Sequence, residues 1–252
     1  MKFVVTAGPT REYLDPVRFL SNPSTGKMGF AVARAAAMRG HEVALVAGPV
    51  SLKTPKGVRR IDVTSARDML AAVEKELFSN SRDMVRYSSG RVGDAPLPVG
   101  AALRADRISQ WSMVFIATAA VADWRPAKCA SRKLKKGQMS DILKLVRNPD
   151  ILKTVARRTK HQAPARIARA STIFVGFAAE TNDVVAEARR KCREKNLDMI
   201  VANDVTEKGS GFGVDTNRVT LVRKDGSVDR LPLMTKLAVA RRIVRECEDL
   251  CP

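Results

Sequence analysis

The sequence contains little that would suit a membrane, a metal site or a base-stacking surface. No apolar run approaches the ~20 residues that a membrane-spanning helix needs, and no signal peptide or membrane anchor is visible, so we expect a cytoplasmic protein. The two histidines and four cysteines lack the spacing of a zinc site, and reduced, inert thiols are the better interpretation. Aromatic residues make up only 5%, which argues weakly against stacking on single-stranded nucleic acid.

Positive charge, by contrast, is abundant and unevenly distributed. The chain has 45 Lys and Arg against 26 Asp and Glu, a net charge of +19. Residues 125–170 alone carry fourteen Lys and Arg against two Asp. Such a field attracts polyanions, and nucleic acids and phosphorylated small molecules both qualify. Solubility or the cellular environment would explain the same surplus, so the charge indicates an anion without identifying it.

Short apolar runs alternate with amphipathic helical patterns along most of the 252 residues. The expected strands are 2–8, 41–48, 58–63, 113–119, 173–179, 199–202, 218–223 and 228–231, and the expected helices are 26–39, 65–78, 184–195 and 234–247. Parallel strands need crossover connections, so the alternation predicts an α/β fold with a Rossmann-like doubly wound parallel sheet. The turn signal at 224–227 predicts a small antiparallel C-terminal extension. We expect one domain over residues 1–252.

Two segments do not fit this sheet. Residues 79–110 are rich in Ser, Gly, Arg and Pro without a helical or strand period, which is typical of a mobile insertion. Residues 133–146 alternate apolar and basic residues around Gly137, which predicts a basic flap. Its lysines would suit a triphosphate, although a charged run is more often only a solvated face.

In a doubly wound sheet, ligands bind beyond the carboxyl ends of the strands. The segment after the first strand contains neither Gly-x-Gly-x-x-Gly nor a Walker A motif, which argues against an NAD(P) oxidoreductase. Ser24 to Gly26 open a helix, where they could hold a phosphate or simply cap the helix. Asp123 follows the fourth strand and could accept from a sugar hydroxyl or bind a cation, or instead pair with Arg125.

Further polar or aromatic residues follow the later strands. Phe177 lies where a ring could pack against a base, although a core Phe is the commoner outcome. Lys191 and Lys195 are four residues apart on a predicted helix and therefore share a face. Asn203 and Asp204 end the sixth strand at the same edge of the sheet.

Together these segments resemble the bacterial phosphopantothenoylcysteine synthetases, in order and over almost the whole chain except 79–110. The matching blocks are TAGPTRE (6–12), DPVRFLSN (15–22), STGKMG (24–29), AAVAD (119–123), KLKK (133–136), NPDI (148–151), VGFAAETN (175–182) and KNLDMIVAND (195–204). Eight ordered blocks are far more specific than any single short motif. Two prolines, Pro9 and Pro23, depart from many relatives.

The resemblance implies a homodimeric ligase of coenzyme A biosynthesis. Its substrates would be 4'-phosphopantothenate, cysteine and CTP, with a divalent cation such as Mg²⁺ as cofactor. The carboxylate of 4'-phosphopantothenate would attack the α-phosphate of CTP and release pyrophosphate. The amine of cysteine would then attack the acyl-cytidylate and release CMP. Many bacterial relatives carry a flavin-dependent decarboxylase domain upstream; this chain begins at the synthetase segment, so we expect a stand-alone synthetase.

The resemblance also implies roles for individual residues. Lys133 would assist acyl-cytidylate formation, and Asn22 would hold the acyl-cytidylate during attack by cysteine. The residues expected to contact the nucleotide are Asp123, Lys133, Asn148, Pro149, Asp150, Ile151, Phe177, Lys191 and Lys195, and those expected to contact phosphopantothenate are Arg18, Asn22 and Ser24. Asp123 is also the candidate metal ligand. The alternative is a basic nucleic-acid-binding protein on a Rossmann-like scaffold, which the charge favours and the low aromatic content opposes.

Overall fold

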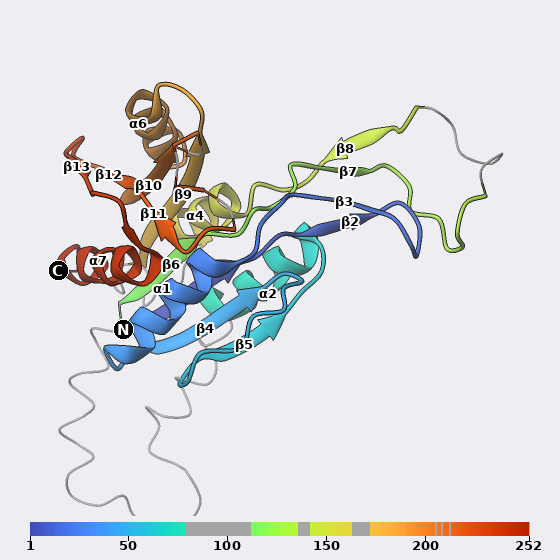
Figure 1. Cartoon of the computed structure of the whole chain (residues 1–252). Helices are drawn as coiled ribbons and strands as arrows, with labels where there is room; N and C mark the ends of the chain where they lie inside the picture. The colour runs from blue at the N-terminus through green and yellow to red at the C-terminus, as the bar shows by residue number, and fades with distance from the viewer. Residues whose placement is uncertain are drawn as a thin grey trace, which may run out of the picture.

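The computed structural model describes residues 1–78, 112–135, 142–162, 172–204, 206–207, 209–211 and 213–251 of the chain (Figure 1). The predicted insertion at 79–110 and the tip of the predicted flap at 136–141 lie outside the described residues. Within the described part, each strand and helix that we expected is present with only slightly shifted bounds.

The centre of the fold is an 8-stranded sheet in the order β13-β12-β10-β9-β6-β1-β4-β5. Its parallel strands are β1 (Lys2–Ala7), β4 (Glu42–Ala47), β5 (Arg59–Asp62), β6 (Met113–Ala117), β9 (Thr172–Glu180) and β10 (Met199–Asp204). The antiparallel strands are β12 (Val219–Arg223) and β13 (Val228–Arg230). The strand order reverses between β1 and β6. The Rossmann-like doubly wound sheet with its antiparallel extension is therefore confirmed, and β1 and β6 flank the switch point where such sheets bind ligands.

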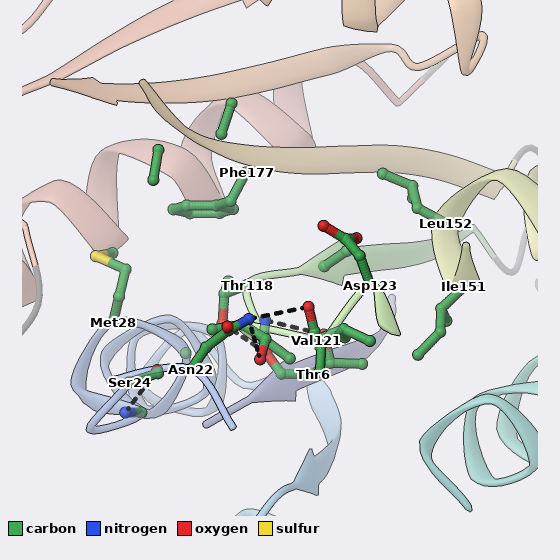
Figure 2. A pocket seen from close by; sticks show the side chains of 18 of the residues that line it. Thr6, Asn22, Ser24, Met28, Thr118, Val121, Asp123, Ile151, Leu152 and Phe177 are labelled. Atoms are coloured by element: carbon green, nitrogen blue, oxygen red, sulfur yellow. Dashed lines mark hydrogen bonds between the residues drawn. The ribbon is translucent and has the colours of Figure 1, made fainter. Parts of the chain in front are cut away.

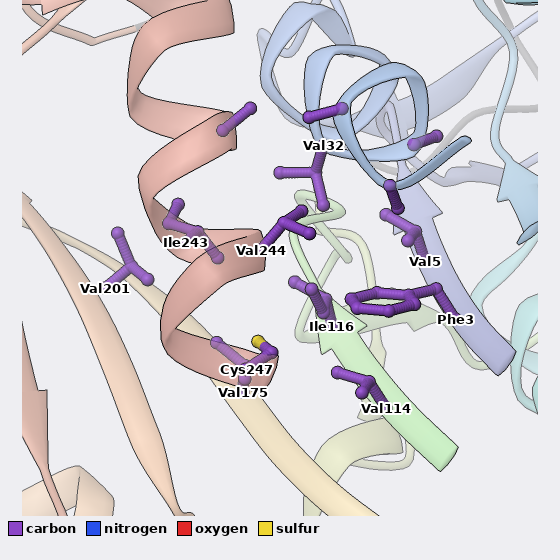
Figure 3. Close-up of a cluster of buried hydrophobic side chains, with 14 of the residues drawn as sticks. Phe3, Val5, Val32, Val114, Ile116, Val175, Val201, Ile243, Val244 and Cys247 are labelled. Atoms are coloured by element: carbon purple, nitrogen blue, oxygen red, sulfur yellow. The ribbon is translucent and has the colours of Figure 1, made fainter. Parts of the chain in front are cut away.

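Helices cover both faces of the sheet. They are α1 (Lys27–Met38), α2 (Ala66–Phe78), α4 (Ile151–Gln162), α6 (Val184–Glu194) and α7 (Lys236–Asp249). α1 and α7 pack against one face, around Phe3, Val5 and Ile116 (Figure 3), whereas α2, α4 and α6 cover the other face, around Val4 and Phe115. Alternate positions of one strand thus serve opposite cores, which explains the uninterrupted apolar runs. No helix of the described part has the length and apolar character to cross a bilayer.

Local interactions fix where α1 and α2 begin. α2 starts with a reciprocal cap: the backbone N–H of Ser65 donates to Asp68 Oδ2 at 2.9 Å, and that of Asp68 donates to Ser65 Oγ at 3.2 Å. α1 follows Gly26, whose φ of 77° is left-handed. A Cβ on Gly29 would lie 2.3 Å from Thr118 Oγ1 and 2.5 Å from Ala7 Cβ. Glycine therefore lets the first turn of α1 lie directly against the carboxyl ends of β1 and β6.

Two short antiparallel pairs project from the carboxyl edge of the sheet (Figure 1). They are β2 (Arg11–Tyr13) with β3 (Phe19–Ser21), and β7 (Trp124–Pro126) with β8 (Leu145–Arg147). We call residues 11–21 and the described residues of 124–147 the arm. A further small pair, β11 (Thr216–Asn217) with β14 (Met234–Thr235), precedes α7.

The arm is where the structure differs from the expectation. We expected a polar loop after the first strand, but β2 and β3 pair around a turn in which Asp15 Oδ1 accepts the backbone N–H groups of Val17 and Arg18, both at 2.9 Å. Strands of three residues are too short to show an alternating pattern. β8, at the end of the predicted flap, pairs with β7, which precedes it. The Arg147 guanidinium of β8 lies 5.1 Å from the ring centroid of Trp124 in β7.

Candidate functional site

A cavity of about 770 Å³ opens at the carboxyl ends of β1, β6, β9 and β10, at the predicted switch point. Most of the predicted site residues line it, although they come from segments far apart in the sequence: Asn22, Ser24, Asp123, Asn148, Pro149, Asp150, Ile151, Phe177, Lys191 and Lys195. In Figure 2, Met28 and Ser24 lie on one side and Ile151 and Leu152 on the other, with Asn22 and Asp123 between them.

Asn22 is held by two backbone carbonyls. Its Nδ2 donates to Ala120 O at 3.3 Å and to Val121 O at 3.1 Å (Figure 2). Both partners can only accept, so they fix the orientation of the amide, and its two N–H groups are both used. Asn22 therefore has its Oδ1, a neutral acceptor, left to offer to a ligand.

Asp123 and Asn148 are joined through the backbone. The backbone N–H of Asn148 donates to Asp123 O at 2.8 Å, and Asn148 Nδ2 donates to Ala122 O at 2.8 Å. Arg125 donates to Asn148 Oδ1 at 3.1 Å and to Arg147 O, whereas no ion pair of the described residues involves Asp123. The simple alternative, an Asp123–Arg125 pair, is thus not what the structure contains. The exposed carboxylate of Asp123 is available at the cavity wall.

Lys191 and Lys195 share a helix face, as predicted, and each meets a carboxylate. Lys191 Nζ lies 2.5 Å from Glu180 Oε1, and Lys195 Nζ lies 2.8 Å from Asp150 Oδ2. Asp150 also caps α4, because its Oδ1 accepts the backbone N–H of Lys153 at 2.9 Å. A polyphosphate bound here would have to share these lysines with acids that already hold them in place.

Phe177 serves both the core and the cavity. It is partly buried against the cluster between the sheet and α1, and its ring also lines the cavity near Met28 (Figure 2). The ring therefore belongs partly to the core, and its contact with a base stays a prediction. A flat apolar surface at this position can pack against a planar ligand group.

Arg18 and Lys133 lie on the arm and do not line the cavity. Arg18 Nη2 lies 2.5 Å from Asp15 Oδ2 and donates to Leu134 O at 2.9 Å, and Leu134 N donates to Asp15 Oδ2 at 3.2 Å. The Arg18 guanidinium and backbone N–H groups hold the pKa of the buried Asp15 carboxyl well below its usual range. This network ties the two hairpins together. Lys133, directly beside Leu134, is exposed.

One group of cavity residues had no role assigned from the sequence. It comprises Thr6, Lys27, Thr118, Gly211, Asn217 and Lys236. The Lys236 side chain is buried at the start of α7, where a single lysine in the sequence looks like any solvated cation. Its place in the cavity wall becomes apparent only in the structure, where it contacts a loop residue 25 positions earlier in the sequence.

The titratable groups in the described part of the chain bear on the expectations for metal and thiol sites. No group of three or more His, Cys, Asp or Glu that could hold a metal ion occurs among the described residues. Burial raises the pKa of the Cys192 and Cys247 thiols and so disfavours their reactive thiolate forms.

Comparison with known proteins identifies the family of the chain. The sequence model of the family described as DNA/pantothenate metabolism flavoprotein C-terminal domain matches residues 1–93 and 102–250. The coenzyme A biosynthesis bifunctional protein CoaBC of Vibrio cholerae is 44% identical over 245 residues, which are 96% of this chain and 51% of that protein. That of Bacillus subtilis is 45% identical over 244 residues, which are 96% of this chain and 50% of that protein. The chain spans about half the length of the curated relatives it matches.

Solved structures are similar over the full length. The crystal structure of the C-terminal domain of CoaBC superposes with a TM-score of 0.67 at 39% identity, covering 99% of this chain and 96% of that one. A Cab2 mutant in complex with phosphopantothenate-cysteine superposes with a TM-score of 0.60 at 18% identity, covering 98% of this chain and 85% of that one. The second likeness concerns the fold alone.

Proposed function

Since the chain belongs to the family of the C-terminal domain of DNA/pantothenate metabolism flavoproteins, we propose that it is a phosphopantothenate–cysteine ligase of coenzyme A biosynthesis. The observation that carries the proposal is the convergence of the residues picked out by the synthetase resemblance. Asn22, Asp123, residues 148–151 and Phe177 are scattered over the sequence, yet they line one cavity together with the lysines of α6.

The proposed reaction has two steps. The carboxylate of 4'-phosphopantothenate attacks the α-phosphorus of CTP and expels pyrophosphate, which forms an acyl-cytidylate. The amine of cysteine then attacks the acyl carbon, expels CMP and loses a proton. Asn22 suits the second step, because its fixed Oδ1 can accept a hydrogen bond from the attacking amine and a neutral amide does not repel the acyl-cytidylate.

Electrostatics favours the same assignment. Both substrates of the first step are anions, so positive groups must offset their repulsion, and Lys191 and Lys195 supply them at the cavity. Mg²⁺ usually binds through one or two carboxylates and the substrate phosphates, and Asp123 is a carboxylate that fits this role. When bound, the ion supplies positive charge against the triphosphate. Lys133 would reach the nucleotide if the arm closes over the cavity.

We further propose that the protein is a homodimer that associates through its arm. Large apolar side chains are exposed there: Val17, Phe19, Trp124, Ile142, Leu143 and Leu145. Clustered exposed apolar groups mark an interaction surface. The β12–β13 hairpin, at the edge of the main sheet, is the second candidate to contribute. Light scattering at micromolar concentration should show about twice the 27.5 kDa of one chain, and a single-chain species alone would contradict the proposal.

The nucleic-acid-binding alternative is not favoured. Family membership and the cavity account for the matching sequence blocks without a polymeric partner. Our proposal therefore includes small-molecule substrates, no nucleic acid, and action in the cytoplasm.

The test is the complete reaction. Purified protein with 4'-phosphopantothenate, cysteine, CTP and Mg²⁺ should form phosphopantothenoylcysteine and CMP, both detectable by mass spectrometry. ATP should replace CTP poorly, and omitting 4'-phosphopantothenate should abolish CMP formation. Equal turnover with ATP would overturn the nucleotide assignment, and no ligated product with either nucleotide would overturn the ligase assignment.

A further inference from the structure

One end of the cavity is built by a loop that none of the assigned roles uses. The loop joins β10 to β11, and Gly211 of the loop and Asn217 of β11 line the cavity. Lys236, the first residue of α7, lies beneath it with only 7% of its surface exposed. Lys236 Nζ donates to Gly211 O at 3.0 Å and to Val214 O at 2.6 Å. An ammonium has three N–H groups, so a third remains for another acceptor.

A second lysine reaches the same loop from α1. Lys27 Nζ donates to Gly213 O at 2.7 Å and to Asp215 Oδ1 at 2.7 Å. α1 and α7 lie side by side on one face of the sheet (Figure 3). Both ammonium groups donate to carbonyls of the same short loop segment, Lys236 to Gly211 O and Lys27 to Gly213 O. Burial and the charge of Lys27 lower the pKa of Lys236, and Lys27 lowers the pKa of Asp215. The three groups therefore influence one another electrostatically.

This end of the cavity has more positive charge than the structure neutralises. Among the described residues, Lys236 has backbone carbonyls as partners and no ion pair with a carboxylate. Asp215 pairs with Lys27, but the Asp215 side chain is 87% exposed. Lys191 and Lys195 differ, because each has its own carboxylate. A buried, uncompensated charge is costly, and an anion bound beside it would remove that cost.

The two sets of cavity lysines come from helices on opposite faces of the sheet. Lys27 and Lys236 belong to α1 and α7 on one face, whereas Lys191 belongs to α6 on the other and Lys195 is the C-cap of that helix. The two bound substrates present two separate groups of phosphates. The nucleotide phosphates lie at the reacting carboxyl of the acid, and the phosphomonoester lies at the far end of the acid. These two groups would therefore need two separate sets of cations.

We propose that Lys236, together with Lys27, recognises the phosphomonoester of the acid substrate and makes the enzyme prefer the phosphorylated acid. The inference rests on the proposed function and goes beyond it by assigning the phosphate to the end of the cavity next to the β10–β11 loop. Asp215 is then the resident counter-ion that the phosphate competes with for Lys27.

The test is a comparison of 4'-phosphopantothenate with pantothenate, which lacks the phosphate. Lys236→Gln should raise the KM for 4'-phosphopantothenate about tenfold or more, the effect of losing a hydrogen bond between charged groups. It should leave the KM for CTP within about threefold and should not worsen the use of pantothenate. Lys75→Gln, which removes an exposed lysine from α2 on the opposite face, is the matched control and should change neither constant. An equal rise for both acids, or a rise for CTP instead, would overturn the inference.

A second variant acts in the opposite direction and does not disturb a buried group. Asp215→Asn removes the competing carboxylate, so the KM for 4'-phosphopantothenate should fall by about threefold while pantothenate is unaffected. If Lys236→Gln does not fold, Asp215→Asn is the deciding test, and an unchanged preference for the phosphorylated acid contradicts the inference.

Calorimetric binding of the two acids to the wild type separates the inference from the proposed function. Preferential binding of the phosphorylated acid without turnover would reject only the ligase assignment, whereas turnover without that preference would reject only the recognition by Lys236.

Discussion

The cavity wall and the arm differ in how they hold the residues expected to act. Asn22 and Asn148 are fixed to backbone carbonyls of residues 120–122, in the segment that follows β6, so the backbone at the sheet edge positions them. Lys133 is exposed on the arm and does not line the cavity, and Arg18 is engaged with Asp15. The comparison suggests a division of labour in which the sheet supplies a preorganised binding surface and the arm brings charge to it during the reaction.

The strongest test of the difference between the wall and the arm is Lys133→Ala. If the arm delivers a cation to the departing pyrophosphate, pyrophosphate release without cysteine should slow by ~10²-fold or more, because negative charge builds there in the transition state. Lys128→Ala, another lysine in the same stretch of the arm, is the control and should have a small effect. Near-normal release by Lys133→Ala would remove the arm from the chemistry.

Asn22→Asp tests the wall instead of the arm. The first half-reaction should continue, but overall turnover should fall on the order of 10²-fold, because a carboxylate repels the acyl-cytidylate and cannot donate to Ala120 O and Val121 O. Mass spectrometry should detect a bound acyl-cytidylate in this variant. Wild-type turnover with cysteine would rule out the role of Asn22.

Lys195→Gln probes the nucleotide side of the wall. Removing a charge that binds phosphate should raise the KM for CTP about tenfold, while the KM for 4'-phosphopantothenate changes little. The paired Asp150 caps α4, so the thermal unfolding temperature should be recorded alongside. Equal changes in both KM values would mean that the lysine supports the fold and not the nucleotide.

The body of the molecule was predictable from the sequence because its strands and helices are long and mostly buried. A buried run such as Phe3 to Val5 shows its strand, and Ser65 with Asp68 marks a helix start. The β2–β3 pair was not predictable, since its geometry depends on a turn around Asp15 and on contacts with Leu134 far along the chain. The synthetase motifs identified most of the cavity wall.

Lys236 shows the other limit of sequence-based prediction. A lysine at a helix start is ordinary, and its burial becomes visible only when α7 is placed beside α1 and the β10–β11 loop. The same holds for Thr118, whose hydroxyl donates to Thr6 O at 2.5 Å across the switch point. Contacts between distant segments, and not residue type, decide which polar groups face the cavity.

A pH titration sharpens the role of the arm network. The pKa of Asp15 is lowered in the folded state, so its ionised form stabilises the fold above its unfolded pKa of ~3.9, and that stability is lost as the pH falls below this value. Asp15→Asn should therefore lower the unfolding temperature at pH 7, and the difference from the wild type should shrink below pH ~4. Thermal unfolding at pH 7 and pH 3 measures this. A difference that is independent of pH would mean that the charge of Asp15 does not hold the arm.

The smallest effect is expected for charge outside both regions. Arg157 is exposed on α4, and Arg158 pairs with Glu74 of α2 at 2.8 Å, so neither serves the cavity. Replacing both with Gln should leave the KM for CTP within a few-fold at ~0.15 M salt, where exposed charges are heavily screened. Arg166 and Arg169, which we expect to behave in the same way, lie outside the described residues. A tenfold rise would show that distal charge is part of the binding site.

The proposed two-step reaction requires an acyl-cytidylate that forms at this cavity before cysteine acts. A single-turnover experiment with enzyme in excess over CTP, with 4'-phosphopantothenate but no cysteine, should release pyrophosphate in a burst and leave the cytidylyl group bound. Adding cysteine should then discharge it as CMP together with phosphopantothenoylcysteine. Pyrophosphate release that requires cysteine from the outset, with no bound acyl-cytidylate at any time, would contradict the account.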